Sequence, residues 1–196
     1  MNELKPGGRV AYFGGSFDPP HLGHLATARA ARTALKLDTV LFAPTGTQPL
    51  KSEGPAASFE DRVAMTRLAL QGEAGMSVSL ADAPRPAGEP NYSAETLTRL
   101  RAELPPGSTL YFLMGADQYA KLDSWHRPDE VRRLARIAVF MRPGYPAPGP
   151  GAQAIPMAPV DISASDIRAR ARRGEDLSGL VPPAVANYIR THRLYS

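Results

Sequence analysis

Short apolar runs alternate with helix-forming stretches along most of the chain. Between them, helices are predicted over 25–31, after Ser58 and over 94–104. The apolar runs predict strands, several of them ended by glycine or proline, at 9–13, 39–43, 76–80, 109–114 and 137–140. This alternation indicates an α/β fold: an open, doubly wound, mostly parallel sheet with helices on both faces. Such sheets bind ligands beyond the carboxyl ends of their strands, near a topological switch point.

The last third of the chain has a different pattern. Residues 143–159 are rich in proline and glycine and predict a loop. Ser163 and Ser165 are expected to cap a basic helix, and Pro182 and Pro183 to open a final one. With 196 residues, 43% of them hydrophobic, the chain can bury one sizeable core. We expect a single domain over 1–196, on which the C-terminal helical part, from about residue 161, packs.

Composition narrows the possible chemistry. The absence of cysteine excludes disulfides, thiolate zinc sites, iron–sulfur clusters and cysteine nucleophiles, and is typical of a reducing cytoplasm. No stretch has the pattern of a membrane helix or a signal peptide. Arginine supplies 19 of the 23 basic residues, but 19 acidic residues are interspersed and the net charge is only +4. We therefore expect neither a membrane nor a nucleic acid as partner.

The turn after the first predicted strand, residues 14–24, concentrates candidate chemistry. Gly14 and Gly15 let a ligand approach the backbone, and the following helix directs unpaired N–H groups toward it, which makes an anion site. The sequence matches neither the GxxxxGK[ST] loop nor the GxGxxG fingerprint. His21 and His24 are spaced to reach one ligand together. They are candidates as metal ligands, as structural caps or as donors to phosphate oxygens, and the last role suits the glycines best.

Residues 14–24 resemble the signature of the HxGH-motif nucleotidyltransferases, in the GG(S/T)FDPxHxGH form of the nicotinate-nucleotide adenylyltransferases. The resemblance covers most of the chain and implies a Rossmann-like fold. It implies catalytic roles for His21 and His24 on the transferred phosphate. The ATP-binding residues that it implies in this turn are Gly14, Gly15, Ser16, Phe17, His21 and His24.

The segment after the second predicted strand, residues 44–51, resembles the corresponding loop of that family. Thr45 is implied in substrate binding, and Lys51 in both substrate binding and catalysis, as a point charge on a phosphate. Many family members have histidine at the position of Leu50, so a polar contact there is not expected. The alternative for Lys51 is a solvated loop lysine.

Residues 91–97 are similar to the family's SYTxxTL segment. The similarity implies that Tyr92 and Ser93 bind the substrate, with the pyridine carboxylate held at a helix N-terminus. Ser93 replaces the usual threonine and is also a candidate N-cap, which needs no ligand.

Two segments follow the fourth predicted strand. Gly115 and Asp117 belong to a GAD sequence like the family's, which implies contacts to ATP and to the substrate's ribose; a helix cap is the alternative for Asp117. Residues 122–126 resemble the LxxWHxW segment. This implies that Trp125 stacks on the nicotinate ring, with His126 in the same site, whereas core packing is the ordinary alternative for the tryptophan.

Residues 161–168 resemble the family's ISSTxIR motif, with Ala164 in place of a small polar residue. Arg168 is implied as a catalytic residue on the β and γ phosphates of ATP. The implied ATP-binding residues of this segment are Ile162, Ser163, Ser165 and Arg168. A solvated basic face is expected for Arg170, Arg172 and Arg173.

The resemblance implies transfer of the adenylyl group of ATP to nicotinate mononucleotide, which yields nicotinate adenine dinucleotide and pyrophosphate in NAD biosynthesis. The acceptor phosphate would attack the α-phosphorus in line without a protein nucleophile, and Mg²⁺ would be carried mainly by ATP rather than by a metal site of the protein. The alternatives are a related transferase that uses nicotinamide mononucleotide or phosphopantetheine, and a non-catalytic nucleotide sensor. The sequence leaves the oligomeric state and the binding order open.

Overall fold

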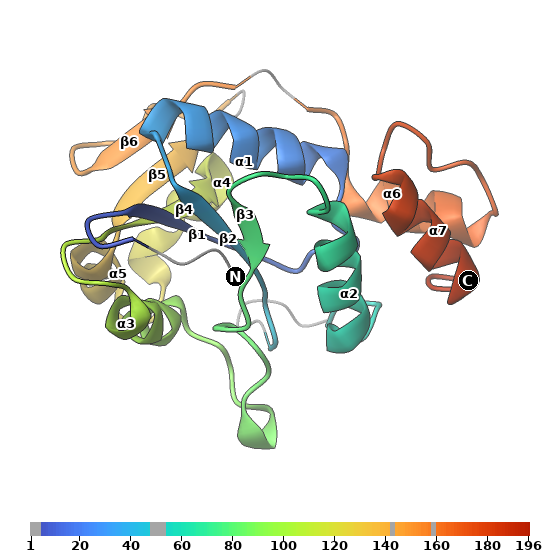
Figure 1. Ribbon diagram of the computed structural model, residues 1–196, viewed down its shortest axis with the longest axis horizontal. Helices are drawn as coiled ribbons and strands as arrows, with labels where there is room; N and C mark the ends of the chain where they lie inside the picture. Colours follow the sequence, from blue (N-terminus) through green and yellow to red (C-terminus); the bar gives the residue numbers. More distant parts are fainter. Residues whose placement is uncertain (1–4, 48–53, 142–143, 158–159) are drawn as a thin grey trace.

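Six parallel strands form one sheet in the computed structural model, which describes residues 5–47, 54–141, 144–157 and 160–196 (Figure 1). The strands are β1 (Arg9–Gly15), β2 (Thr39–Pro44), β3 (Met76–Val78), β4 (Thr109–Gly115), β5 (Arg136–Phe140) and β6 (Ala152–Ile155). Their order is β3-β2-β1-β4-β5-β6, and every pairing is parallel. The predicted doubly wound α/β fold is confirmed. Because the chain runs outward from β1 to β3 and then returns to β4, the switch point lies between β1 and β4.

Helices cover both faces of this sheet (Figure 1). They are α1 (Leu22–Leu35), α2 (Phe59–Ala69), α3 (Ser93–Glu103), α4 (Ala116–Tyr119), α5 (Pro128–Leu134), α6 (Ala164–Arg172) and α7 (Pro183–Thr191), with short 3-10 helices η1 (Pro86–Gly88) and η2 (Leu122–Ser124). Successive side chains of a strand point to opposite faces. Val10 and Tyr12 of β1 therefore pack with α3 and α5, whereas Ala11 and Phe13 pack with α1.

The pairing register brings the carboxyl ends of the central strands to one edge. Gly15 at the end of β1 pairs with Pro44 at the end of β2, and Gly115 at the end of β4 pairs with Phe140 at the end of β5. The turns that leave these strands therefore emerge next to one another, which is where the family motifs were expected.

Helices α6 and α7 lie beside α2 at one end of the molecule (Figure 1). Met65 and Ala69 of α2 share a buried apolar cluster with Ile167 of α6 and with Val185 and Ile189 of α7. The C-terminal helices thus share an apolar cluster with α2, and the carbonyl of Leu180 between them accepts a hydrogen bond from the N–H of Leu22 at the start of α1 (2.9 Å). That the chain is one domain stays a prediction.

One prediction about the fold is wrong, since part of the segment 143–159 forms a strand. Ala152–Ile155 pair with β5 as the edge strand β6, and Ile155 is fully buried. This short run of Ala-Gln-Ala-Ile has little β signal of its own, and its conformation comes from pairing with β5.

In the part of the chain that the structure describes, no helix could span a bilayer.

The cap predictions have different outcomes. The hydroxyls of Ser58 and Ser163 accept hydrogen bonds from the backbone N–H groups of Asp61 (3.0 Å) and Asp166 (3.1 Å), so both serines cap their helices as predicted. Ser165 lies inside the first turn of α6 and is not its cap.

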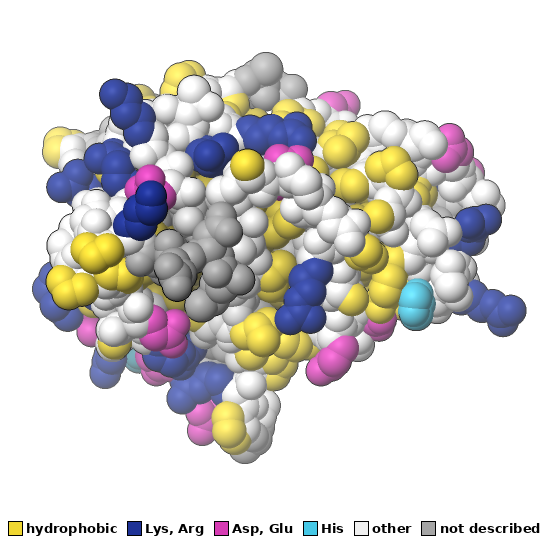
Figure 2. Space-filling model, in the orientation of Figure 1, with side chains coloured by type: hydrophobic (Ala, Val, Ile, Leu, Met, Phe, Trp, Pro, Cys, Tyr) yellow, Lys and Arg dark blue, Asp and Glu magenta, His cyan; other side chains and the backbone are white. Residues whose placement is uncertain are grey.

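Basic side chains are scattered among acidic ones on the face shown in Figure 2, without one basic patch.

Candidate active site

The turn between β1 and α1 is held in a specific shape by buried side chains. Phe17 has a φ of 47°, a left-handed conformation that is uncommon for residues other than glycine. Its side chain is only 2% exposed, and its ring packs edge-on against Phe13 (5.6 Å between centroids) and His24 (5.0 Å). This packing fixes the unusual backbone, which is typical of functional turns.

His21 and His24 lie together at the start of α1. Their rings are stacked, with centroids 3.7 Å apart and planes inclined by 28°. The Nδ1 atom of His24 accepts a hydrogen bond from the backbone N–H of His21 (3.1 Å), so the neutral His24 ring carries its proton on Nε2. The Nδ1 atom of His21 is buried and has no hydrogen-bond partner among the described residues. A Cβ at position 23 would lie 2.9 Å from this atom, which is too close. Glycine at position 23 therefore leaves the space that the His21 ring occupies.

Burial controls the charge of both imidazoles. It lowers the pKa of His21 from 6.5 to about 4. For His24, burial and then the neighbouring His21 lower the pKa well below 6.5. In the ligand-free protein both rings are therefore neutral at pH 7. Each neutral ring still has one N–H to donate, and the negative charge of a bound phosphate would raise both pKa values.

Helix α6 brings Arg168 to the same turn. Its Nη1 atom donates to the backbone carbonyl of Asp18 (2.9 Å) and lies 3.9 Å from the Asp18 Oδ2 atom. Ser163, the cap of α6, has its hydroxyl 3.1 Å from that of Ser165. The motifs at 14–24 and 161–168, far apart in sequence, thus meet in space.

The residues predicted to bind the acceptor gather at the start of α3. Tyr92 occupies the N-cap position and Ser93 is the first helical residue, so the N-cap alternative for Ser93 is wrong. The Tyr92 ring lies 4.2 Å from the ring of His126, with the planes inclined by 32°. Trp125 is half-buried, lies 6.1 Å from the Phe112 ring and packs against the sheet core. Both roles weighed for this tryptophan are therefore compatible with its place.

Thr45, Gly115 and Asp117 follow or end β2 and β4, the strands on either side of β1. Thr45 follows β2, and its backbone N–H donates to the carbonyl of Gly15 (2.9 Å). Gly115 ends β4 and stands at the N-cap position of α4. Asp117 is the second residue of α4, so the helix-cap alternative for it is wrong. Lys51 lies outside the described residues.

Sequence reasoning missed a buried arginine beneath the site. Arg62 of α2 is 2% exposed, and its Nη1 atom donates to the carbonyls of Ser16 (2.7 Å) and Thr45 (2.9 Å). It thereby ties the turn after β1 to the turn after β2. The available signal was its position, since Arg62 shares a helix face with the buried residues Met65 and Ala69.

A buried carboxylate supports the acceptor side and was also missed. Asp82 is 3% exposed and accepts hydrogen bonds from the hydroxyls of Thr96 (2.7 Å) and Tyr12 (3.3 Å). Burial raises its pKa. Since Thr96 lies one turn after Ser93, Asp82 anchors the start of α3 to the sheet.

No group of three His, Asp or Glu side chains within 5–47, 54–141, 144–157 and 160–196 is arranged to hold a metal ion.

Comparison with known proteins shows the family. Residues 12–170 match the family described as cytidylyltransferase-like. The chain is 41% identical to a probable nicotinate-nucleotide adenylyltransferase from Laribacter hongkongensis, over 95% of this chain and 94% of that protein. The chain belongs to the nicotinate-nucleotide adenylyltransferase family. A second probable member, from Solibacter usitatus, is also 41% identical, over 96% of this chain and all of that protein.

A solved structure gives the same fold. Plasmodium falciparum nicotinic acid mononucleotide adenylyltransferase, complexed with NaAD, matches 96% of this chain and 97% of its own, with a TM-score of 0.74 and 18% identity. At that identity the match shows the shared architecture, while the sequence relatives show the family. The resemblance inferred from residues 14–24 is confirmed.

Proposed function

We propose that this chain performs the reaction for which its family is named, the transfer of the adenylyl group of ATP to nicotinate mononucleotide. The observation that carries the proposal is that His21 and His24 stack at the turn after β1, and that Arg168 bonds to the backbone of the same turn. Two imidazole donors and a guanidinium around a glycine-rich turn suit a triphosphate.

The phosphate-binding residues act by position and charge. The N–H groups of His21 and His24 meet the oxygens of the α-phosphate, where negative charge is stabilised as the transition state forms. Arg168 has five N–H groups; the bond to the Asp18 carbonyl fixes the guanidinium, and the others face the β and γ phosphates. Further ATP contacts are proposed for Gly14, Gly15, Ser16, Phe17, Gly115, Asp117, Ile162, Ser163 and Ser165.

The chemical step needs no protein nucleophile. An oxygen of the mononucleotide's phosphate forms a bond to the α-phosphorus, the bond from that phosphorus to the bridging oxygen breaks, and pyrophosphate leaves. We treat Mg²⁺ as part of the ATP substrate, since the described residues offer it no cage of their own.

The acceptor is proposed to bind at the start of α3. Its pyridine carboxylate meets the first N–H groups of the helix at Ser93, and its ring stacks on the aromatic side chains of Tyr92, Trp125 and His126. Thr45 and Asp117 border the ribose and phosphate. Lys51 keeps its proposed role on a phosphate.

Pyrophosphate release tests the function. The protein is incubated with Mg²⁺, ATP and one acceptor at a time: nicotinate mononucleotide, nicotinamide mononucleotide or phosphopantetheine. We expect the highest kcat/KM with nicotinate mononucleotide, together with the dinucleotide product by mass spectrometry. A higher kcat/KM with another acceptor would reassign the substrate. ATP binding without product from any acceptor would favour the nucleotide sensor.

A further inference from the structure

A buried carboxylate of the β1–α1 turn has no role in the reaction described above. Asp18 is 4% exposed, and its side chain accepts hydrogen bonds from the backbone N–H groups of Ala56 (2.7 Å) and Ala57 (3.1 Å). The hydroxyl of Tyr195 donates to its Oδ1 atom (2.8 Å). One residue thus joins the turn to the segment before α2 and to the residues that follow α7.

The same residue holds Arg168 on its other side. The Asp18 carbonyl accepts from Arg168 Nη1 at 2.9 Å, and the Oδ2 atom lies 3.9 Å from that nitrogen. The rotation of the carboxylate therefore affects both the backbone of the turn and the place of the guanidinium. Tyr195 and Ala57 bond to Oδ1 and Ala56 bonds to Oδ2, while Arg168 is bonded to the backbone carbonyl of the same residue.

A reversal of the chain after α7 brings Tyr195 to this place. Arg193, with a φ of 50°, closes the helix, since the N–H of Leu194 donates to the carbonyl of Ile189 (3.0 Å). Tyr195 has a φ of 69°, in the left-handed region that costs about 1–3 kcal/mol for residues other than glycine. Burial and the Asp18 carboxylate raise the pKa of Tyr195, so the phenol stays protonated and remains a donor. A strained backbone that ends in a buried hydrogen bond to a charged group indicates that the contact has a structural consequence.

We propose that Tyr195 is a positioning residue for adenylyl transfer, because its hydrogen bond to Asp18 fixes the turn that presents His21 and His24 relative to Arg168. The proposal rests on the proposed function. Tyr195 touches no substrate; it acts through Asp18 on the groups that hold the triphosphate. Loss of its hydroxyl leaves the carboxylate with only the hydrogen bonds from Ala56 and Ala57, so the Asp18 backbone, whose carbonyl accepts from Arg168, is less firmly fixed relative to the imidazoles.

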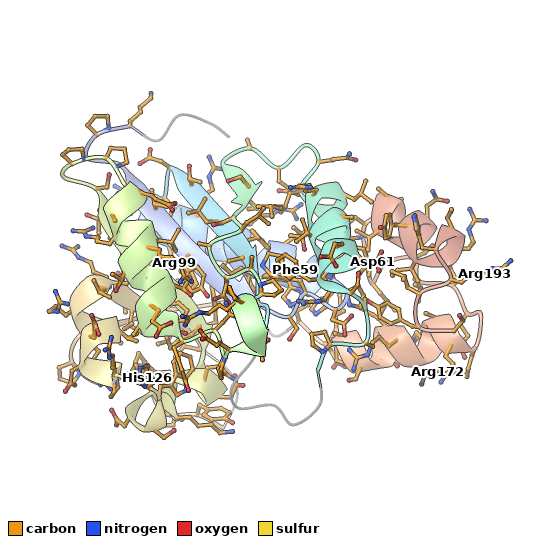
Figure 3. All side chains as sticks on the ribbon, turned by 90° about the horizontal axis from the view of Figure 1, so that it is seen from below. Phe59, Asp61, Arg99, His126, Arg172 and Arg193 are labelled. Carbon is orange, nitrogen blue, oxygen red and sulfur yellow. The ribbon has the colours of Figure 1, made fainter. Side chains whose placement is uncertain are left out.

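The test is Tyr195→Phe, which keeps the ring and removes the hydroxyl. We expect kcat to fall about tenfold and the Kd for ATP to rise severalfold, with an unchanged KM for nicotinate mononucleotide, because small displacements of positioned groups are costly to rate. Tyr188→Phe is the matched control. The Tyr188 hydroxyl donates at 2.9 Å to Asp61, which lies on α2 and is labelled in Figure 3. That variant should keep kcat within twofold of the parent.

Two results would overturn the proposal. One is a Tyr195→Phe variant with the parent's kcat and ATP affinity. The other is an equal fall in kcat and in Tm for both tyrosine variants, which is what a merely structural role predicts. The ATP titration separates this inference from the proposed function, because it compares the two variants even if no acceptor yields pyrophosphate.

Discussion

The two halves proposed for the candidate site both rest on buried charged groups, but they differ in the side chains that face a ligand. The phosphate half, formed by residues 14–24 and Arg168, rests on buried charged groups: Asp18 is 4% and Arg62 is 2% exposed, and both bond to backbone atoms. The pyridine half is formed by half-buried or exposed aromatic rings at the start of α3. In Figure 3 the labelled His126 shows where this pyridine half lies, at the opposite end of the molecule from Arg172.

This difference indicates a division of labour, in which the two halves determine different kinetic constants. Donors that face the transition state must already be in place when charge develops, and buried hydrogen bonds keep them there. The aromatic rings proposed to bind the acceptor would contribute stacking, which tolerates small shifts. Changes in the phosphate half should therefore lower kcat, and changes in the pyridine half should mainly raise the KM for the acceptor.

The largest effect is expected from His24→Ala. Removal of one transition-state donor lowers kcat by about two to three powers of ten. Steady-state kinetics measures kcat, and thermal unfolding serves as the control for folding. If activity and thermal stability fall together, His24 has a structural role and the division of labour loses its main support.

The second effect concerns pH and the free energy of unfolding. Above pH 6.5 His21 is neutral in both the folded and the unfolded chain. Below pH 6.5 His21 binds a proton in the unfolded chain, whereas in the folded chain burial keeps it neutral down to about pH 4. The free energy of unfolding should therefore fall by about 3 kcal/mol as pH falls from 6.5 to 4. Urea unfolding of the parent and of His21→Ala across this range measures the difference; parallel curves would show that His21 titrates normally.

The smallest effect is expected from Trp125→Ala. Loss of one stacking surface should raise the KM for nicotinate mononucleotide about tenfold, with kcat and the KM for ATP nearly unchanged. Steady-state kinetics with each substrate varied in turn makes the measurement. An unchanged KM for the mononucleotide would leave Trp125 as a core residue only, and a fall in kcat alone would erase the contrast between the two halves.

The sequence predicts features that depend on residues close together in the chain. Apolar runs ended by glycine or proline predict the central strands. The two histidines of the turn at 14–24 can be recognised because their spacing on one helix is a local property. The edge strand β6 has no such signal, since Ala152–Ile155 becomes a strand only by pairing with β5.

The supporting charges of the site could not be predicted for the same reason. The contact of Arg168 with Asp18 joins residues 150 positions apart, and that of Tyr195 with Asp18 joins residues 177 apart. Sequence spacing does not reveal such pairs, because they exist only once α2, α6 and α7 have packed. The motif residues were therefore predictable, whereas the residues that hold them were found in the structure.

We propose that the protein holds two phosphates in line and supplies no nucleophile of its own. The stereochemical course at the α-phosphorus tests this proposal, with ATP that carries a chiral thiophosphate at the α position and nicotinate mononucleotide as acceptor. A single in-line displacement predicts inversion of configuration in the dinucleotide product. Retention would show two displacements through a covalent adenylyl-enzyme, and would contradict the account.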